Sequence, residues 1–357
     1  MDEFEVSTIM GIGGFVVGLL FGALTHRTNF CTMGSISDAV SFADFRRARA
    51  WLLAIAVSIA GAHALQYAEL IDLTQSIYLG SSLNLFGAIL GGLIFGFGMV
   101  IASGCPGRNL ARVGGGDLKA LVVLLFIGLF GYMALRGLIA PLRSFIQTGS
   151  TFDLNGVAIS DQQLGTVIAD LSGLPRKAAQ AGSAGIVVAA LLFFCFRNSD
   201  FRSSPGHVAA GLGIGLLVTA GWWITGVLGG DEFEPAQLAS LTFVAPTGNG
   251  LQYLMTYTGA TINFGIATVG GAILGAFLSA MLGRKFFLSS FYDKKDTVYH
   301  MAGGAMMGTG GVLALGCTIG QGITGISTLS IGSAIALVSI VAGGYAGIKY
   351  MERAIGL

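Results

Sequence analysis

The stretch GGAMMGTGGVLALGCTIGQG, residues 303–322, is a glycine-rich apolar run that ends on a cysteine. Residues 91–110, GGLIFGFGMVIASGCPGRNL, repeat its pattern. Eight of the twenty positions match, and each cysteine comes fourteen residues after the first glycine. A partial third copy, VGLLFGALTHRTNFC, occupies residues 17–31. Internal repeats of apolar segments are typical of membrane proteins built from two related halves.

The composition indicates an all-α polytopic membrane protein. Of 357 residues, 54% are hydrophobic and only 10% are charged, and the mean hydropathy is +0.77. Soluble domains carry about a quarter charged residues. Because a helix needs roughly 20 apolar residues to cross a bilayer, the sequence predicts about nine spans: 8–25, 48–68, 85–103, 118–140, 182–197, 206–228, 262–282, 299–315 and 330–350.

Four segments between these spans are shorter and rich in Gly, Ser and Thr: 31–45, 105–116, 245–257 and 317–327. They are too short to cross a membrane and too apolar for ordinary surface loops. Such backbone is tolerated at membrane depth where protein or a water-filled cavity satisfies its polar groups. We therefore predict four short re-entrant helices or loops.

The order of spans and re-entrant segments divides the chain into two halves. Residues 1–181 form a first half, 182–205 a connecting helix, and 206–357 a second half with the same order of elements. A single connecting span inverts the second half relative to the first. Inverted, pseudo-symmetric halves are the plan of many transporters, whose sites lie near the midplane between the repeats.

The basic residues predict the orientation in the membrane. Fifteen of the nineteen Lys and Arg residues fall on one side of this arrangement. The acidic stretches MDEFEV and GGDEFEP fall on the other side. Because Lys and Arg collect on cytoplasmic loops, we expect the N-terminus outside and the C-terminus in the cytoplasm.

Many of the 57 glycines stand four residues apart. Such pairs are Gly18 with Gly22, Gly92 with Gly96, and Gly304 with Gly308. Small residues at this spacing let membrane helices approach closely. The spacing predicts a tightly packed bundle.

The three repeat cysteines, Cys31, Cys105 and Cys317, are the main candidate site residues. In the predicted arrangement Cys31 and Cys105 approach the centre from the cytoplasmic side, and Cys317 approaches it from the outer side. Short helices that begin there would direct N–H groups toward an anion. Thiols are weak, polarizable partners, and weak contacts at several depths suit permeation. They favour an anion with an exposed sulfur or selenium.

Other thiol chemistry is less favoured by the sequence. No CxxC pair occurs, which argues against a zinc site or a disulfide framework, and no metal or other cofactor is expected. Cys195 lies within a predicted span without a repeat partner, so we interpret it as packing. A thiol enzyme or redox sensor would need an accessible thiolate.

Further candidates adjoin these cysteines or lie in the fourth, cysteine-free segment. Gly104 and Gly316 directly precede a cysteine, Arg27 and Arg108 could line a mouth of the pathway, and Asn249, Thr318 and Gln321 could donate hydrogen bonds. Each has an alternative role. Arg27 could belong to an ordinary polar helix end, Arg108 could contact lipid headgroups, and the neutral side chains could join helices.

Taken in order, the motifs RTNFCTMGSISD, SGCPGRNLARVGGG, APTGNGLQYL, INFGIATVGGAILGAF and LGCTIGQGI resemble those of the YeeE/YedE sulfur-transport family. The resemblance spans roughly residues 11–350. It implies nine transmembrane helices with short re-entrant helices in two pseudo-symmetric halves. It also implies thiosulfate uptake across the bacterial inner membrane, with Cys31, Cys105 and Cys317 passing the ion inward by weak hydrogen bonds, without covalent chemistry or ATP.

The resemblance further implies a cytoplasmic partner, a small sulfur-carrier protein with a TusA-like fold. No enzymatic activity and no nucleic-acid partner are expected. Two alternatives stay open: transport of another sulfur or selenium species, and a membrane thiol protein acting in redox chemistry or sulfur sensing.

Overall fold

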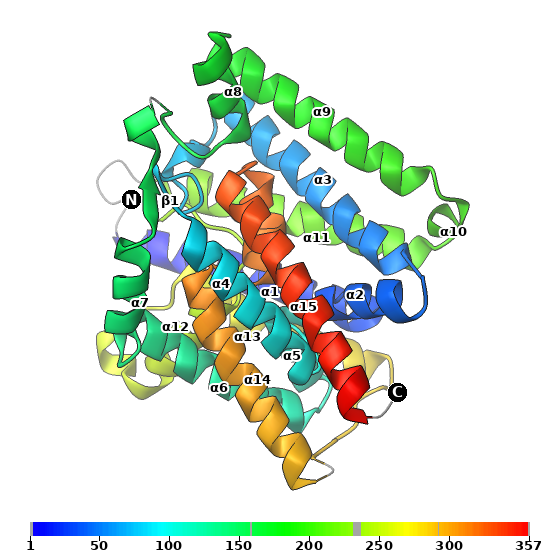
Figure 1. Cartoon of the computed structure of the whole chain (residues 1–357). Helices are drawn as coiled ribbons and strands as arrows, with labels where there is room; N and C mark the ends of the chain where they lie inside the picture. The colour runs from blue at the N-terminus through cyan, green and yellow to red at the C-terminus, as the bar shows by residue number, and fades with distance from the viewer. Residues whose placement is uncertain (1–2, 158, 231–236, 292, 356–357) are drawn as a thin grey trace.

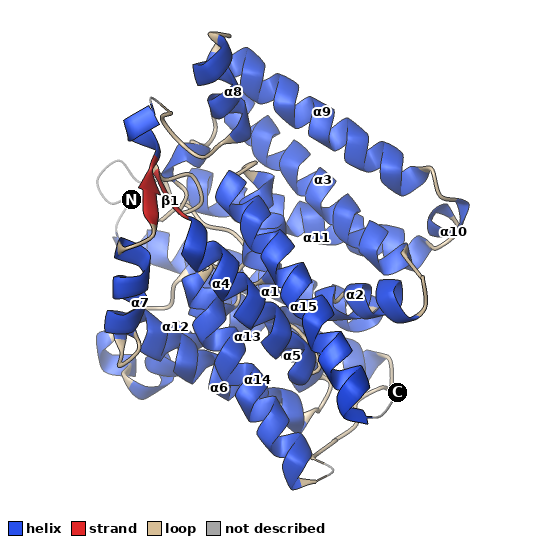
Figure 2. Ribbon diagram, viewed as in Figure 1, coloured by secondary structure: helices blue, strands red, loops and turns tan. Residues whose placement is uncertain are grey.

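The chain is almost entirely helical (Figures 1 and 2). The computed structural model describes residues 3–157, 159–230, 237–291 and 293–355. Within these ranges the only sheet is a pair of three-residue strands, β1 (Ser82–Asn84) and β2 (Thr151–Asp153), which pair antiparallel. The predicted class, an all-α polytopic membrane protein, is confirmed.

The long helices are α1 (Glu3–Thr28), α3 (Arg46–Tyr67), α4 (Leu85–Ile101), α6 (Leu118–Arg136), α9 (Arg176–Phe196), α11 (Pro205–Trp223), α13 (Phe264–Leu282), α14 (Lys294–Leu313) and α15 (Ile331–Ile355). The shorter ones are α2 (Thr32–Ser41), α5 (Pro106–Gly114), α7 (Ala140–Thr148), α8 (Leu164–Ser172), α10 (Ser199–Arg202) and α12 (Val244–Met255). Single turns are η1 (Leu73–Gln75), η2 (Leu154–Val157), η3 (Ile224–Leu228), η4 (Tyr257–Gly259) and η5 (Gly320–Gly325).

Each predicted span coincides with a long helix. Within the described residues, eight helical segments are long and apolar enough to cross a membrane. The predicted span 299–315 is not among them, although α14 covers most of it. This helix begins with three charged residues and is rich in glycine, which lowers its mean hydropathy. The count of nine spans therefore stays a prediction.

The four predicted re-entrant segments form short helices. They are α2, α5, α12 and a helical stretch at 318–327 that contains η5. Long helices surround two of them: α5 packs against α1, α6 and α13, and η5 against α3, α11 and α15. Their polar backbone ends thus lie within the protein, as such segments require.

Helices of one half pack mainly against helices of the other half. Helix α1 packs along α13, and α11 packs along α3. Likewise α4 packs along α15, and α14 packs along α6, while α4 and α14 pack against each other. The connecting helix α9 lies along α3, outside these pairs (Figure 1). Two inverted copies that pack face to face would produce this pattern.

The predicted glycine pairs lie at helix contacts. A Cβ on Gly18 or Gly22 would overlap the backbone carbonyl oxygen of Thr268 or Ala272 on α13. Gly92 and Gly96 meet α15 in the same way, and Gly304 and Gly308 meet α6. Backbones this close exclude any side chain at these positions, which confirms the predicted close packing.

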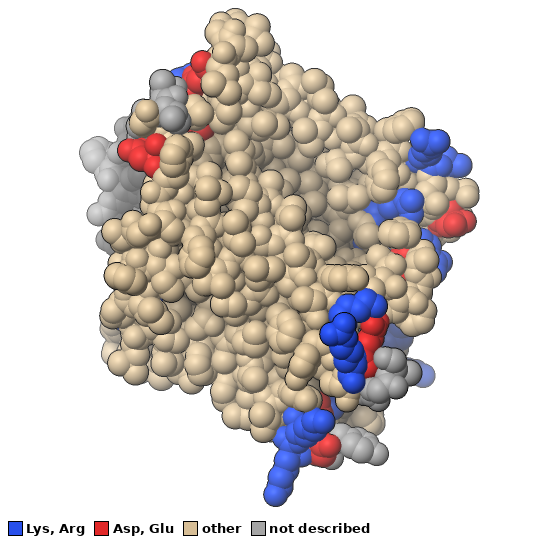
Figure 3. Space-filling model, in the orientation of Figure 1, with Lys and Arg blue, Asp and Glu red and all other residues tan. Residues whose placement is uncertain are grey.

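Charged side chains gather at two ends of the molecule. In Figure 3, Lys and Arg lie mainly over α10, the start of α14 and the end of α15. A broad face without charge separates this end from the opposite one, where Asp and Glu are prominent. Of the predicted acidic stretches, residues 1–2 and 231–235 lie outside the described part of the chain.

Candidate functional site

The same backbone turn leads into each of the three repeat cysteines, Cys31, Cys105 and Cys317. The residue two positions earlier has a left-handed backbone: Asn29 with φ 53°, Ser103 with φ 57° and Leu315 with φ 59°. One such residue stops a helix and reverses the chain direction locally. A short helix begins immediately after each cysteine.

The hydrogen bonds of this turn repeat at an offset of 212 residues, the offset of the sequence repeat. The N–H of Gly104 donates to the carbonyl of Met99 at 2.9 Å, and the N–H of Gly316 donates to the carbonyl of Gly311 at 2.7 Å. The predicted site glycines therefore belong to the helix-ending turns. Their shared role is to present the following cysteine.

Two of the thiols cap a helix N-terminus. The sulfur of Cys31 accepts from the N–H of Gly34 at 3.5 Å, and the sulfur of Cys317 accepts from the N–H of Gly320 at 3.3 Å. Cys105 holds the corresponding position before Pro106, without a side-chain cap bond. The remaining free N–H groups give each helix start a partial positive charge.

Cys31 and Cys105 lie together around a narrow gap. Their side chains contact each other, and the Thr318 side chain faces Cys105 from the other half of the chain. Thr32, Trp51 and Arg108 also border the gap, which leaves no room for a water molecule. Two predicted site residues thus meet, and a third lies beside them.

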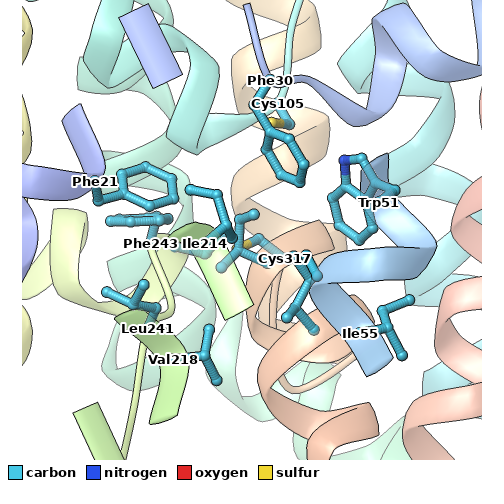
Figure 4. Packing of buried hydrophobic residues seen from close by; sticks show 14 of the residues in the cluster. Phe21, Phe30, Trp51, Ile55, Cys105, Ile214, Val218, Leu241, Phe243 and Cys317 are labelled. Carbon is cyan, nitrogen blue, oxygen red and sulfur yellow. The ribbon is translucent and has the colours of Figure 1, made fainter. Parts of the chain in front are cut away.

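Aromatic rings pack around the thiols: in Figure 4 the ring of Phe30 lies between Cys105 and Cys317, and Phe21 and Phe243 lie to one side of them. Phe21 and Phe243 have ring centroids 4.7 Å apart, and Phe30 stacks on Trp51 at 5.5 Å. All three repeat cysteines are buried. The described structure is therefore closed between Cys317 and the other two thiols.

A hollow of about 780 Å³ leads toward Cys317 from the end that carries the start of α1. Tyr78, Arg136, Thr242 and Asn249 are among its lining residues, and Thr242 lies beside Cys317. Burial and the nearby Cys317 raise the pKa of Tyr78, so its hydroxyl stays protonated at neutral pH and can donate. The predicted residue Asn249 thus lies in the hollow.

The two predicted arginines have different positions. Arg108 borders the gap and donates to the side-chain oxygen of Asn29 at 2.8 Å. Arg27, in contrast, is exposed at the end of α1 and is not brought to the cysteines.

The predicted neutral donors are buried beside Cys317. Gln321 donates from its amide to the carbonyl of Ala314 and so holds the turn before the cysteine. Thr318 is fully buried, and its hydroxyl faces the sulfur of Cys105, a weak acceptor, without a hydrogen bond of normal geometry to the described chain. Cys195 lies apart from this site and donates to the carbonyl of Arg49 at 3.4 Å, which agrees with a packing role.

Several residues of the site do not stand out in the sequence. The rings of Phe21, Phe30, Trp51 and Phe243 come from four segments, so no spacing rule would have grouped them. Thr32 could have been found, because a threonine directly follows Cys31 as Thr318 follows Cys317.

The chain is similar in sequence to two named proteins and matches one family model. The chain is 28% identical to "Thiosulfate transporter TsuA" of Escherichia coli K12 over 352 residues, which cover 94% of this chain and 92% of that protein. It is also 28% identical to "Thiosulfate transporter TsuA" of Spirochaeta thermophila over 337 residues, covering 93% and 96% of the two chains. The family model described as "Sulphur transport" matches residues 27–346. The chain therefore belongs to the sulphur transport family, the family predicted from its cysteine motifs.

Proposed function

We propose that this protein takes up thiosulfate through a central pathway in which Cys317, Cys105 and Cys31 are successive weak contacts. One observation carries the proposal: the three cysteines begin three short helices between the outer hollow and Arg108. Helix N-termini attract an anion, and thiols bind its sulfur weakly enough for release. No covalent step is needed, so the protein acts as a transporter and not as an enzyme.

The proposed route begins at the hollow, where Arg136 is the one charged lining residue among those described. The ion then passes Thr242 and Cys317, crosses the aromatic rings, and reaches Cys105 and Cys31. Arg108 stands at the far end of this route. The rings must move for the ion to pass, because the described gap is closed.

We further propose the bacterial inner membrane as the location, with the N-terminus outside and the C-terminus in the cytoplasm. The clustering of Lys and Arg at the α10 end supports this orientation (Figure 3). Residues 1–181 and 206–357 would be two inverted halves joined by 182–205, an arrangement that the helix pairs between the halves support. The basic end would receive a TusA-like sulfur-carrier protein.

Uptake of radiolabelled thiosulfate into proteoliposomes tests the proposal. Cys31→Ala, Cys105→Ala and Cys317→Ala should each lower the initial rate by about tenfold or more, as expected when a contact to a charged ion worth 1.5–3 kcal/mol is lost. Cys195→Ala is the matched control and should retain the normal rate. Full activity of the Cys317→Ala protein, correctly inserted, would contradict the pathway.

A second candidate function rests on the contact between Cys31 and Cys105. Two adjacent thiols could instead act in redox chemistry or sulfur sensing. Serine variants separate the two functions, because a hydroxyl can still hydrogen-bond to the ion but cannot form a disulfide. Partial uptake by Cys31→Ser supports transport through weak contacts, and its complete loss supports thiol chemistry.

A further inference from the structure

Three buried hydrogen-bond donors around the gap make no hydrogen bond of normal geometry in the described part of the chain, although one of them, the Thr318 hydroxyl, faces the weakly accepting sulfur of Cys105. They are the indole N–H of Trp51 and the hydroxyls of Thr32 and Thr318. The three residues are between 0% and 5% exposed. A buried donor without an acceptor costs about 1–3 kcal/mol, so native proteins seldom keep three in one place.

These donors converge on the cysteine pair. Trp51 and Thr32 line the same gap as Cys31 and Cys105, and Thr318 faces Cys105 from the opposite half. In Figure 4 the indole nitrogen of Trp51 is on the side of the ring where Phe30 and Cys105 lie. Donors from three separate elements thus lie beside the cysteine pair.

The chemistry of the gap defines what would satisfy them. An indole N–H can only donate, so the missing group must be an acceptor. Arg108 is the one charged residue that lines the gap, and no carboxylate lines it among the described residues. The starts of α2 and α5 add further N–H groups. An anion with several oxygens fits these conditions.

We propose that, when the gap opens, Trp51, Thr32 and Thr318 bind the oxygen atoms of a sulfur-terminated tetrahedral oxyanion while Cys31 and Cys105 face its terminal sulfur. The oxygen end and the sulfur end of the ion thus contact different groups. The donors select oxyanions of this class over sulfur anions that have no oxygen. This assignment rests on the proposed function and adds the residues that determine its specificity.

The two threonines occupy equivalent places in the chain. Each directly follows a repeat cysteine at the start of a short helix, one in each half. A hydroxyl and a thiol are therefore presented side by side twice. Trp51 has no such counterpart, and the edge of its ring packs against Gly322 in η5, so that it bridges the halves.

Kinetics of thiosulfate uptake into proteoliposomes test this assignment. Trp51→Phe, Thr32→Val and Thr318→Val each remove a donor with little change of shape. Each should raise KM about tenfold or more, because hydrogen bonds to charged groups are strong, while the maximal rate changes less. Trp223→Phe is the matched control, since Trp223 is 41% exposed and lies outside the gap.

Serine variants keep the hydroxyl and distinguish binding from packing. Thr32→Ser and Thr318→Ser should keep a KM near that of the unmodified protein. Unchanged KM in the Trp51→Phe and valine variants would overturn the assignment, as would equal losses in the serine and valine variants. If one variant fails to fold, as judged by size-exclusion chromatography, the other two decide.

The unmodified protein separates the two proposals. If it takes up no thiosulfate, the proposed function fails. If it transports thiosulfate and the donor variants keep its KM, only the donor assignment fails. Hydrosulfide, which has no oxygen, provides a second readout as a competitor. Any inhibition by hydrosulfide should be equally strong in the unmodified and Trp51→Phe proteins. If Trp51→Phe weakens the binding of thiosulfate and of hydrosulfide equally, selection by oxygen contacts is contradicted.

Discussion

The left-handed residues before the three cysteines are the smallest features that shape the site. Ser103 has φ 57° although it carries a side chain, and the N–H of Gly104 closes the turn behind it. The guanidinium of Arg112 donates to the Ser103 carbonyl at 2.9 Å, and Arg112 is held in turn by Asp117 at 2.7 Å. These contacts offset the roughly 1–2 kcal/mol that a left-handed backbone costs an ordinary residue.

Substitution of Ser103 tests this conformation. Ser103→Val should lower the stability of the protein by about 1–2 kcal/mol, because a β-branched side chain clashes most in the left-handed region. Ser103→Gly should be neutral or stabilising, since glycine adopts this backbone freely. Thermal unfolding in detergent measures both. Equal melting temperatures for the two variants would show that the turn is not strained.

At the scale of the element, backbone contacts between helices determine the packing. Gly22 on α1 meets the carbonyl of Ala272, and Gly275 on α13 meets the carbonyl of Leu19. Contacts of this kind recur at the other helix pairs of the bundle. They fix the position of α1 and thus of the turn that presents Cys31.

A matched pair of alanine variants tests these contacts. In an isolated helix, Gly→Ala is favourable by about 1 kcal/mol. At Gly22 the overlap with Ala272 should outweigh this gain and destabilise the protein by about 1–3 kcal/mol. Gly270→Ala lies on α13 in open space and should be neutral or slightly stabilising. Melting curves with the opposite ranking would contradict the close contact of α1 and α13.

For the whole molecule, the main feature is that the proposed pathway is closed in its middle. The hollow lined by Tyr78 ends near Thr242, the ring of Phe30 lies between Cys105 and Cys317 in Figure 4, and Phe21 and Phe243 pack together beside these thiols. Transport requires that these rings separate. The closed state also explains why the three thiols are buried together with apolar side chains.

Thiol labelling tests this closure. A charged, membrane-impermeant alkylating reagent applied to membranes should modify Cys105 slowly in a protein that keeps only this cysteine. Phe243→Ala removes one ring and should speed the labelling about tenfold, the ratio given by 1.4 kcal/mol of easier opening. Phe287→Ala, an exposed residue far along the chain from the rings, is the control. Unchanged labelling in Phe243→Ala would exclude these rings as the barrier.

The sequence alone determined the membrane class, the helices and the three cysteine positions. Apolar segments of this length form helices in a bilayer, so they can be predicted from the sequence. The repeat around Cys105 and Cys317 is a local pattern and can be predicted in the same way. The tertiary structure decided which residues meet. It placed Thr318 beside Cys105, left Arg27 exposed, and brought Trp51 to the gap. Such contacts join segments that lie tens to hundreds of residues apart, and they depend on helix packing that no local pattern encodes.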